Sequence, residues 1–204
     1  MNMRPSTGEQ GFTLVELLVT IVIMGIVASG ITSVVVSTLG TEQYQRQLQD
    51  VVDDGRVSLQ RIRQELRGAR RVLDSSAPDR LHFWVDQNQD SLVTPEEQIC
   101  YVVEAISATQ WQISRWAHAE DAADCAPGAI PAGQTPRVVA STLISSNPSD
   151  PTETPAPFVY APAPGGINEP PTREVTIDLD LEVESARGPE SVQVQGSIRL
   201  RNVP

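Results

Sequence analysis

A run of oxygen-bearing side chains between positions 86 and 97 has the spacing of a calcium-binding loop. Asp86, Asn88, Asp90, Thr94 and Glu97 occupy positions 1, 3, 5, 9 and 12 of a twelve-residue pattern. Carboxylate and carbonyl oxygens are the ligands that Ca²⁺ prefers, and an EF-hand loop supplies them at these positions. The sequence therefore supports the hypothesis of a calcium site.

Two features of this loop favour a different interpretation. Ser91 stands where a calcium loop of this type has glycine, and the flanking segments read as strands where an EF-hand has helices. The alternative is a polar hairpin loop whose Asp and Asn side chains bond to its own backbone. Both interpretations stay open. Calcium is the only ion that the sequence suggests, and no other cofactor is expected.

The chain has two cysteines, Cys100 and Cys125. They are too few for a disulfide scaffold and are not spaced as a CxxC pair. Two buried thiols are one interpretation, and a single disulfide is the other. Export from the cytoplasm would favour the disulfide.

No group of residues in the sequence points to catalysis. His82 and His118 are the only histidines, and neither lies in a recognised nucleophile motif. The net charge of −11 also disfavours nucleic acid, because binding a phosphate backbone needs clustered cations. We therefore expect a chain that is not an enzyme and does not bind nucleic acid by itself.

A long apolar segment lies close to the N-terminus. From Leu17 to Thr41, 25 consecutive residues carry no charge. A helix of this length can cross a hydrocarbon core of about 30 Å. The hydrophilic residues 1–11 precede it, and no signal-peptide cleavage pattern follows it. Residues 12–41 are therefore predicted to form a membrane-spanning helix.

One acidic residue, Glu16, lies inside this apolar surrounding, four residues after Phe12. A carboxylate at membrane depth is costly, so an acid there is a functional hypothesis by default and needs a positive partner. The alternative is that Glu16 lies among the lipid headgroups, with its charge hydrated.

Residues 11–16, Gly-Phe-Thr-Leu-Val-Glu, resemble the N-terminal motif of type IV pilins and type II secretion pseudopilins. The resemblance implies that a prepilin peptidase cuts between Gly11 and Phe12 and usually methylates the new amine of Phe12. It also implies that Glu16 meets the N-terminal amine of a neighbouring subunit during assembly. Such a pair removes an unpaired charge from an apolar medium. The chain departs from many major pilins at Ser33, where they have a helix-kinking proline.

Beyond the apolar segment, apolar or small residues recur every three or four positions from Tyr44 to Leu73. This period predicts a single helix over residues 13–72, with one face on a sheet and its charged face, including Arg63, in water. A coiled coil is the alternative.

Six β-rich runs follow the predicted helix, at residues 81–85, 99–103, 111–116, 138–143, 174–183 and 192–201. Eight prolines between Ser146 and Thr172 mark a surface insertion. We expect residues 158–160 to form a short edge strand there and the rest to be mobile.

These elements predict an α+β fold of the pilin type, with a long N-terminal helix packed on an antiparallel sheet. Its expected parts are a leader (residues 1–11), a transmembrane and assembly helix (12–41) and a globular domain (42–204) with a proline-rich insertion (146–172).

Short motifs at residues 61–69, 83–86 and 200–202 look like those of the PilW and GspJ group of minor pilins and pseudopilins. The resemblance implies a structural minor subunit of a type IV pilus or a type II secretion pseudopilus. Its expected partners are the prepilin peptidase and other pilins. Its expected place is the bacterial inner membrane, with the C-terminal domain outside the cytoplasm, and then a filament. A pilus-tip adhesin or DNA-uptake receptor is the alternative function.

Overall fold

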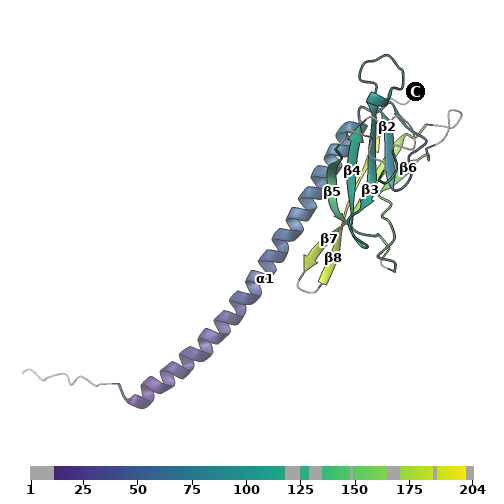
Figure 1. Ribbon diagram of the computed structural model, residues 1–204. Coiled ribbons are helices and arrows are strands. Elements are labelled where there is room, and N and C mark those ends of the chain that lie inside the picture. Colours follow the sequence, from purple (N-terminus) through teal and green to yellow (C-terminus); the bar gives the residue numbers. More distant parts are fainter. Residues whose placement is uncertain are drawn as a thin grey trace, which may run out of the picture. The chain divides into compact units, whose positions relative to one another are not determined.

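The computed structural model describes residues 12–117, 125–128, 135–147, 149–164, 171–185 and 188–200. The chain divides into two compact units, Met1–Gln45 and Arg46–Pro204. Helix α1 (Leu14–Leu66) contributes to both units, whereas every strand belongs to the second (Figure 1).

The second unit contains one eight-stranded antiparallel sheet in the order β1-β2-β3-β4-β5-β7-β6, with β8 paired to β7. Its strands are β1 (Arg71–Val72), β2 (Arg80–Trp84), β3 (Gln98–Ala105), β4 (Trp111–Ala117), β5 (Arg137–Leu143), β6 (Phe158–Ala161), β7 (Glu174–Ser185) and β8 (Gly188–Arg199), and a short 3₁₀ helix, η1 (Pro95–Glu97), precedes β3. Each of the six predicted β-rich runs overlaps one of these strands. The predicted α+β class, with a long N-terminal helix on an antiparallel sheet, is confirmed.

Helix α1 ends at Leu66, so the prediction that it continues to position 72 was wrong. Beyond Leu66 the amide of Arg70 donates to the carbonyl of Trp84 at 2.9 Å, and Arg71–Val72 pairs with β2. Gly68, a poor helix former, lies in the turn between them. Pairing with the sheet satisfies the backbone groups that a longer helix would have satisfied internally.

The C-terminal turns of α1 pack on one face of the sheet (Figure 1). Leu59, Ile62 and Leu66 are buried there, as the apolar period predicted. They join one core with side chains from the strands, among them Leu81, Phe83, Tyr101, Ile113, Leu143, Phe158, Ile177, Leu179 and Leu181.

Gly55 allows α1 to approach β7 and β8 closely. A Cβ atom at this position would lie 2.7 Å from Cδ1 of Leu181 and 3.1 Å from Cγ2 of Val194. The first distance is shorter than van der Waals contact, so any side chain here would force the Leu181 side chain, the helix or the strands to shift.

The apolar alternation of β8 is interrupted at Gly196 because Arg63 of α1 occupies that space. A Cβ on Gly196 would lie 1.9 Å from Nη2 of Arg63. Nε of Arg63 is buried and has no hydrogen-bond partner. The guanidinium of Arg63 therefore lies against β8, although Arg63 as a whole stays partly exposed, as the prediction of a charged face in water allows.

Part of the proline-rich segment packs on the sheet. Pro157 and Phe158 are buried, and Phe158 pairs with Ile177 of β7. The hydroxyl of Tyr160 donates to the carbonyl of Arg80 at 2.6 Å. The predicted short strand at residues 158–160 is confirmed. The expected mobility of the rest of the insertion stays a prediction.

Candidate functional site

The predicted cleavage point lies just before helix α1. Gly11 is outside the described residues, and Phe12 is 81% exposed and precedes the helix, which begins at Leu14. Exposed chain at a terminus is where proteases cut most readily. Phe12, the residue that follows the predicted cleavage bond, is therefore accessible to a peptidase.

Thr13 caps the N-terminus of α1. The amide of Glu16 donates to Oγ1 of Thr13 at 3.3 Å and to its carbonyl oxygen at 3.1 Å. Thr-x-x-Glu is the spacing of a capping box, in which the acid also interacts favourably with the partial positive charge of the helix N-terminus. The sequence-based site did not include Thr13, although this spacing identifies it. The cap fixes Glu16 in the first turn of the helix, close to Phe12.

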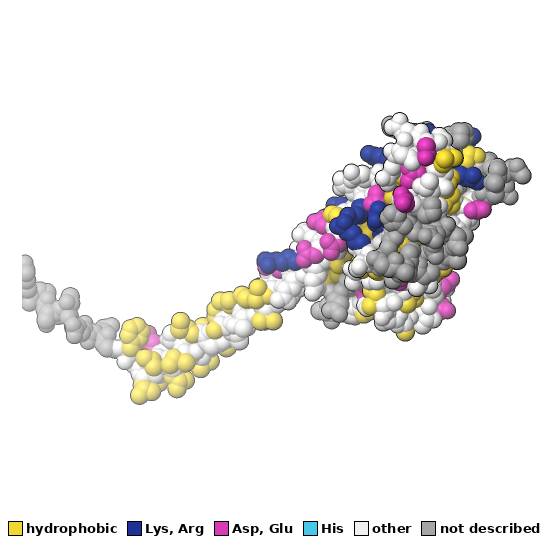
Figure 2. Space-filling view, turned by 45° about the horizontal axis from the view of Figure 1, so that its top comes forward, with side chains coloured by type: hydrophobic (Ala, Val, Ile, Leu, Met, Phe, Trp, Pro, Cys, Tyr) yellow, Lys and Arg dark blue, Asp and Glu magenta, His cyan; other side chains and the backbone are white. Residues whose placement is uncertain are grey.

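The first part of α1 is apolar and uncovered. All residues from Phe12 to Gln43 are exposed. An 18-residue window of the helix has a mean hydropathy of 2.5, and none of it is buried. Figure 2 shows hydrophobic side chains along this part of the helix. By length and composition the helix can cross a membrane, and contact with lipid or with other helices would remove this surface from water.

Cys100 and Cys125 form a disulfide, with Cα atoms 5.7 Å apart. With Val102 and Trp116 they make a second, smaller buried cluster. Neighbouring residues of a strand point to opposite faces, so Cys100 and Val102 lie on the face of β3 opposite to Tyr101, which faces the main core. The disulfide therefore holds the chain around Cys125 on the face of the sheet away from α1.

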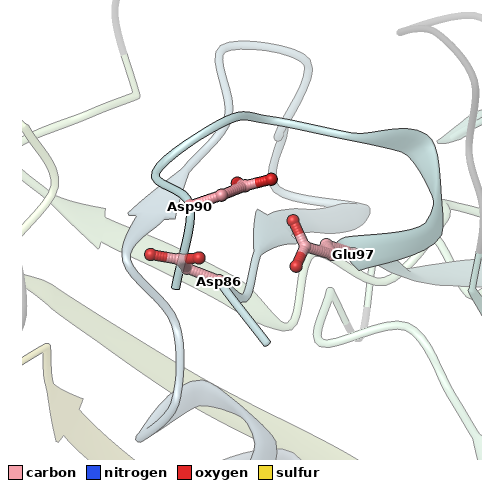
Figure 3. Close-up of side chains that lie close together, drawn as sticks. All are labelled: Asp86, Asp90 and Glu97. Carbon is pink, nitrogen blue, oxygen red and sulfur yellow. The ribbon is translucent and has the colours of Figure 1, made fainter. Parts of the chain in front are cut away.

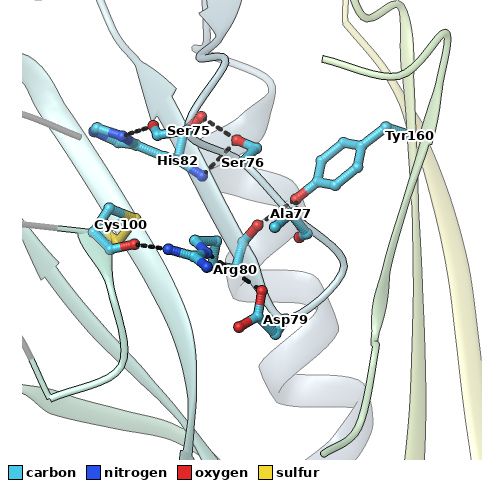
Figure 4. Close-up of a disulfide and its surroundings, with 9 residues drawn as sticks. Ser75, Ser76, Ala77, Asp79, Arg80, His82, Cys100 and Tyr160 are labelled. Carbon is cyan, nitrogen blue, oxygen red and sulfur yellow. Dashed lines mark hydrogen bonds and ion pairs between the residues drawn. A yellow bond between two sulfur atoms is a disulfide. The ribbon is translucent and has the colours of Figure 1, made fainter. Parts of the chain in front are cut away.

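Polar contacts surround this disulfide (Figure 4). Nη1 of Arg80 donates to the carbonyl of Cys125 at 3.3 Å, and its Nε donates to Oδ1 of Asp79 at 3.3 Å. The amide of His82 donates to Oγ of Ser76 at 2.9 Å. These contacts hold the turn before β2 and the segment around Cys125 in place. The disulfide, which lies among them, therefore has a structural role.

The predicted calcium loop brings three of its five residues together. Ligand oxygens of Asp86, Asp90 and Glu97 lie within 4.8 Å of one another (Figure 3). Asn88 and Thr94 take part through hydrogen bonds, since Nδ2 of Asn88 donates to Oδ2 of Asp90 at 2.9 Å and Oγ1 of Thr94 donates to Oε2 of Glu97 at 3.2 Å. These bonds are also what the hairpin-loop interpretation predicts.

The backbone of the loop turns at Gln89 and Ser91, with φ angles of 62° and 61°. This left-handed conformation is the one that glycine adopts most readily. A calcium loop of this type has glycine at this position. Ser91 replaces that glycine but still adopts the left-handed backbone conformation that glycine favours.

Glu97 closes the loop through both oxygens. Oε1 accepts hydrogen bonds from the amides of Gln87 and Asn88 at 2.9 and 3.1 Å, and Oε2 accepts one from the indole of Trp84 at 3.1 Å. The Trp84 hydrogen bond, together with those from the backbone, lowers the pKa of Glu97. Glu97 is therefore a fixed negative charge. Nothing in the sequence indicates that the indole of Trp84 contacts this loop.

Asp86 lacks such hydrogen bonds. Its side chain is 1% exposed, and neither carboxylate oxygen has a hydrogen-bond partner. Its cationic neighbour among the described residues is Arg70, with Nη2 3.4 Å from Oδ2 of Asp86 and a side chain that is 44% exposed. Nothing in the sequence points to Arg70, because this contact depends on β1 pairing with β2.

Comparison with known proteins identifies one family motif. The prokaryotic N-terminal methylation motif matches residues 7–32, a range that contains Phe12, Thr13, Glu16 and the start of α1. No curated protein and no solved structure matches the chain significantly. The motif implies processing by a prepilin peptidase and assembly with other pilins. The chain thus carries the signature of type IV pilins and pseudopilins at its N-terminus, at the start of a long helix that packs on an antiparallel sheet.

Proposed function

We propose that this chain is a structural minor pilin or pseudopilin subunit. It is cut between Gly11 and Phe12, held in the inner membrane by α1 with its sheet outside the cytoplasm, and then added to a filament. The observation that carries the proposal is Glu16, fixed in the first turn of an uncovered apolar helix inside the motif at residues 7–32.

Cleavage creates the positive group, the amine of Phe12, that can pair with Glu16 of a neighbouring subunit. A cut before Phe12 creates an amine four residues from Glu16, in a medium where charges are poorly solvated. The helix N-terminus favours the carboxylate only modestly, by typically about 0.3–1 kcal/mol. An ammonium of a neighbouring subunit would interact with it much more strongly at low dielectric. Pairing across subunits therefore favours assembly and sets the axial register.

The uncovered part of α1 supports the same proposal. Its apolar side chains suit lipid before assembly and the helices of other subunits afterwards, since both remove apolar surface from water. One helix can then serve as membrane anchor and as filament contact. The proposal needs no catalytic group, and pilins with this motif are structural subunits.

The disulfide supports the proposed orientation. Disulfides persist in oxidising compartments such as the periplasm and are rare in the cytoplasm. A Cys100–Cys125 bridge in the second unit fits a sheet that lies outside the cytoplasm.

The proposal that the chain is a minor and not a major subunit rests on the resemblance of its short motifs to those of the PilW and GspJ group.

The proposal is tested in the native bacterium by replacing Glu16. Sheared filaments and membranes are separated, and the subunit is measured in each by immunoblotting. We expect Glu16→Ala to be processed normally yet to stay in the membrane, and Glu16→Asp to recover part of the filament signal. Asp50→Ala, which removes an exposed acid further along α1, is the matched control and should behave as wild type. Wild-type amounts of Glu16→Ala in filaments would contradict the proposal.

A further inference from the structure

We propose that the loop of residues 86–97 binds one calcium ion, with Asp86 as its principal ligand and Asp90 as its second. This site is independent of the assembly function, since it lies in the second unit and uses none of the residues of the N-terminal motif.

The positions of the three carboxylates fit such an ion. Oxygens on opposite sides of Ca²⁺ lie about 4.6–5.2 Å apart, because each Ca–O distance is about 2.3–2.6 Å. The ligand oxygens of Asp86, Asp90 and Glu97 lie within 4.8 Å of one another, and Figure 3 shows the three side chains close together. A cation between them would need little rearrangement of the loop.

The independent observation is the state of Asp86. A buried carboxylate without hydrogen-bond donors is costly, and proteins normally satisfy each buried charge. Asp90 and Glu97 both accept hydrogen bonds within the loop. Asp86 accepts none, although its side chain is 1% exposed. A cation in the loop would satisfy the two oxygens that the protein leaves without donors.

Arg70 balances only part of this negative charge. It lies 3.4 Å from Asp86 without making a hydrogen bond to it, and its side chain is partly in solvent. Three carboxylates around one arginine leave a net negative charge, which favours a divalent cation.

Glu97 has a different part in the site. Its oxygens already accept four hydrogen bonds, from Trp84, Gln87, Asn88 and Thr94. It therefore acts mainly as a fixed charge that holds the two ends of the loop together, while Asp86 and Asp90 supply lone pairs.

The donor set favours calcium over other metals. Among the described residues the cluster contains carboxylates alone, without histidine or cysteine, which disfavours zinc and copper. Ca²⁺ accepts six to eight oxygens in irregular geometry, including backbone carbonyls and water, whereas Mg²⁺ demands a near-ideal octahedron. A loop with few free carboxylate oxygens suits weak binding, with a Kd of about 10⁻⁴–10⁻³ M, as in extracellular modules.

Trp84 allows metal binding to this loop to be detected by luminescence. Its indole donates to Glu97 at 3.1 Å, so a Tb³⁺ ion in the loop would lie near enough to be excited through this tryptophan. The full chain, purified in a non-ionic detergent, is titrated with Tb³⁺ by luminescence and with Ca²⁺ by calorimetry. Competition by Ca²⁺ then shows whether both ions use one site.

Asp86→Asn and Asp90→Asn test the two ligands, with far-UV circular dichroism to show that each variant folds. Asp150→Asn is the matched control for Asp90→Asn, because Asp150, like Asp90, is an exposed loop aspartate that accepts a hydrogen bond from the amide two residues on. We expect one saturable Ca²⁺ site in wild type and in Asp150→Asn, and at least about tenfold weaker binding in the two loop variants.

Trp84→Phe should lose the Tb³⁺ luminescence, because it removes the indole that lies beside Glu97. Absence of calcium heat in wild type at millimolar concentration would overturn the proposal even if a variant failed to fold. Equal affinities in wild type, Asp86→Asn and Asp90→Asn would overturn it as well.

Discussion

The hydroxyl of Tyr101 on β3 donates a 2.8 Å hydrogen bond to Oε2 of Glu65 in the last turn of α1. Nε of Arg115 on β4 donates to both oxygens of the same carboxylate, at 3.0 and 2.9 Å. Burial and the nearby charge of Glu65 raise the pKa of Tyr101, so its hydroxyl keeps its proton. One carboxylate therefore joins the helix to two neighbouring strands.

Replacing Glu65 by alanine should destabilise the second unit. The change leaves the hydroxyl of Tyr101 and the guanidinium of Arg115 without their partner, which costs about 1–3 kcal/mol. Chemical unfolding followed by circular dichroism measures the loss. Gln64→Ala, at the neighbouring exposed position, should change the stability by less than about 0.5 kcal/mol. Equal effects of the two substitutions would show that the link contributes nothing.

Gly55→Val should also destabilise the fold, for a steric reason. The new side chain would overlap Leu181 and Val194, and overpacking of this kind typically costs about 1–3 kcal/mol. Gly40→Ala is the control, because within the subunit a Cβ there meets nothing within 4 Å. Since alanine favours helix over glycine, this control should leave thermal stability unchanged or raise it. A Gly55→Val protein as stable as wild type would contradict the close approach of α1 to the sheet.

Removing the disulfide should lower stability without changing the fold. The bridge joins cysteines 25 residues apart in sequence, and a native disulfide of this kind is typically worth about 2–4 kcal/mol. Cys100→Ala with Cys125→Ala should therefore unfold at lower denaturant concentration than wild type. A reductant should lower the midpoint of wild type and leave that of the double variant unchanged. If reductant has no effect on wild type, the bridge does not stabilise the protein.

Two aspartates should affect the pH dependence of stability in opposite directions. Burial, together with the nearby charge of Asp178, raises the pKa of Asp180. Its ionised form therefore opposes folding, most fully above the raised pKa and not at all below the unfolded value of about 3.9. Asp180→Asn should raise the melting temperature at pH 7, and the gain should disappear in acid.

Ionisation of Asp150 should have the opposite effect on stability. Hydrogen bonds from the hydroxyl and the amide of Thr152 lower its pKa. Its stabilisation is therefore present above the unfolded pKa and is lost as the pH falls through the folded one. Asp150→Asn should lower the melting temperature at pH 7 and have little effect in strong acid. Thermal melts of both variants from pH 3 to 8 check the two signs, and curves that shift in the same direction would contradict them.

The sequence predicts well the features that depend on local pattern. The positions of Leu59, Ile62 and Leu66 on one helix face follow from the period of apolar residues, and the strands follow from alternation. The N-terminal motif consists of consecutive residues, so Phe12 and Glu16 can be identified without knowledge of the fold.

Features that depend on contacts between distant segments could not be predicted in this way. The end of α1 is set by pairing of Arg71–Val72 with β2, and Arg63 lies against β8 because Gly196, far along the chain, leaves room for its guanidinium. The hydrogen bonds of Glu97 and the lack of them at Asp86 depend on how the whole loop closes. Periodicity describes one segment at a time and carries no information on these contacts.

The most direct test of the account is the intact mass of the subunit recovered from the native bacterium. We predict a chain that begins at Phe12 and carries one added methyl group on its N-terminal amine, and a Gly11→Val variant that keeps residues 1–11. A wild-type chain that retains these residues, or that is cut at another bond, would contradict the account.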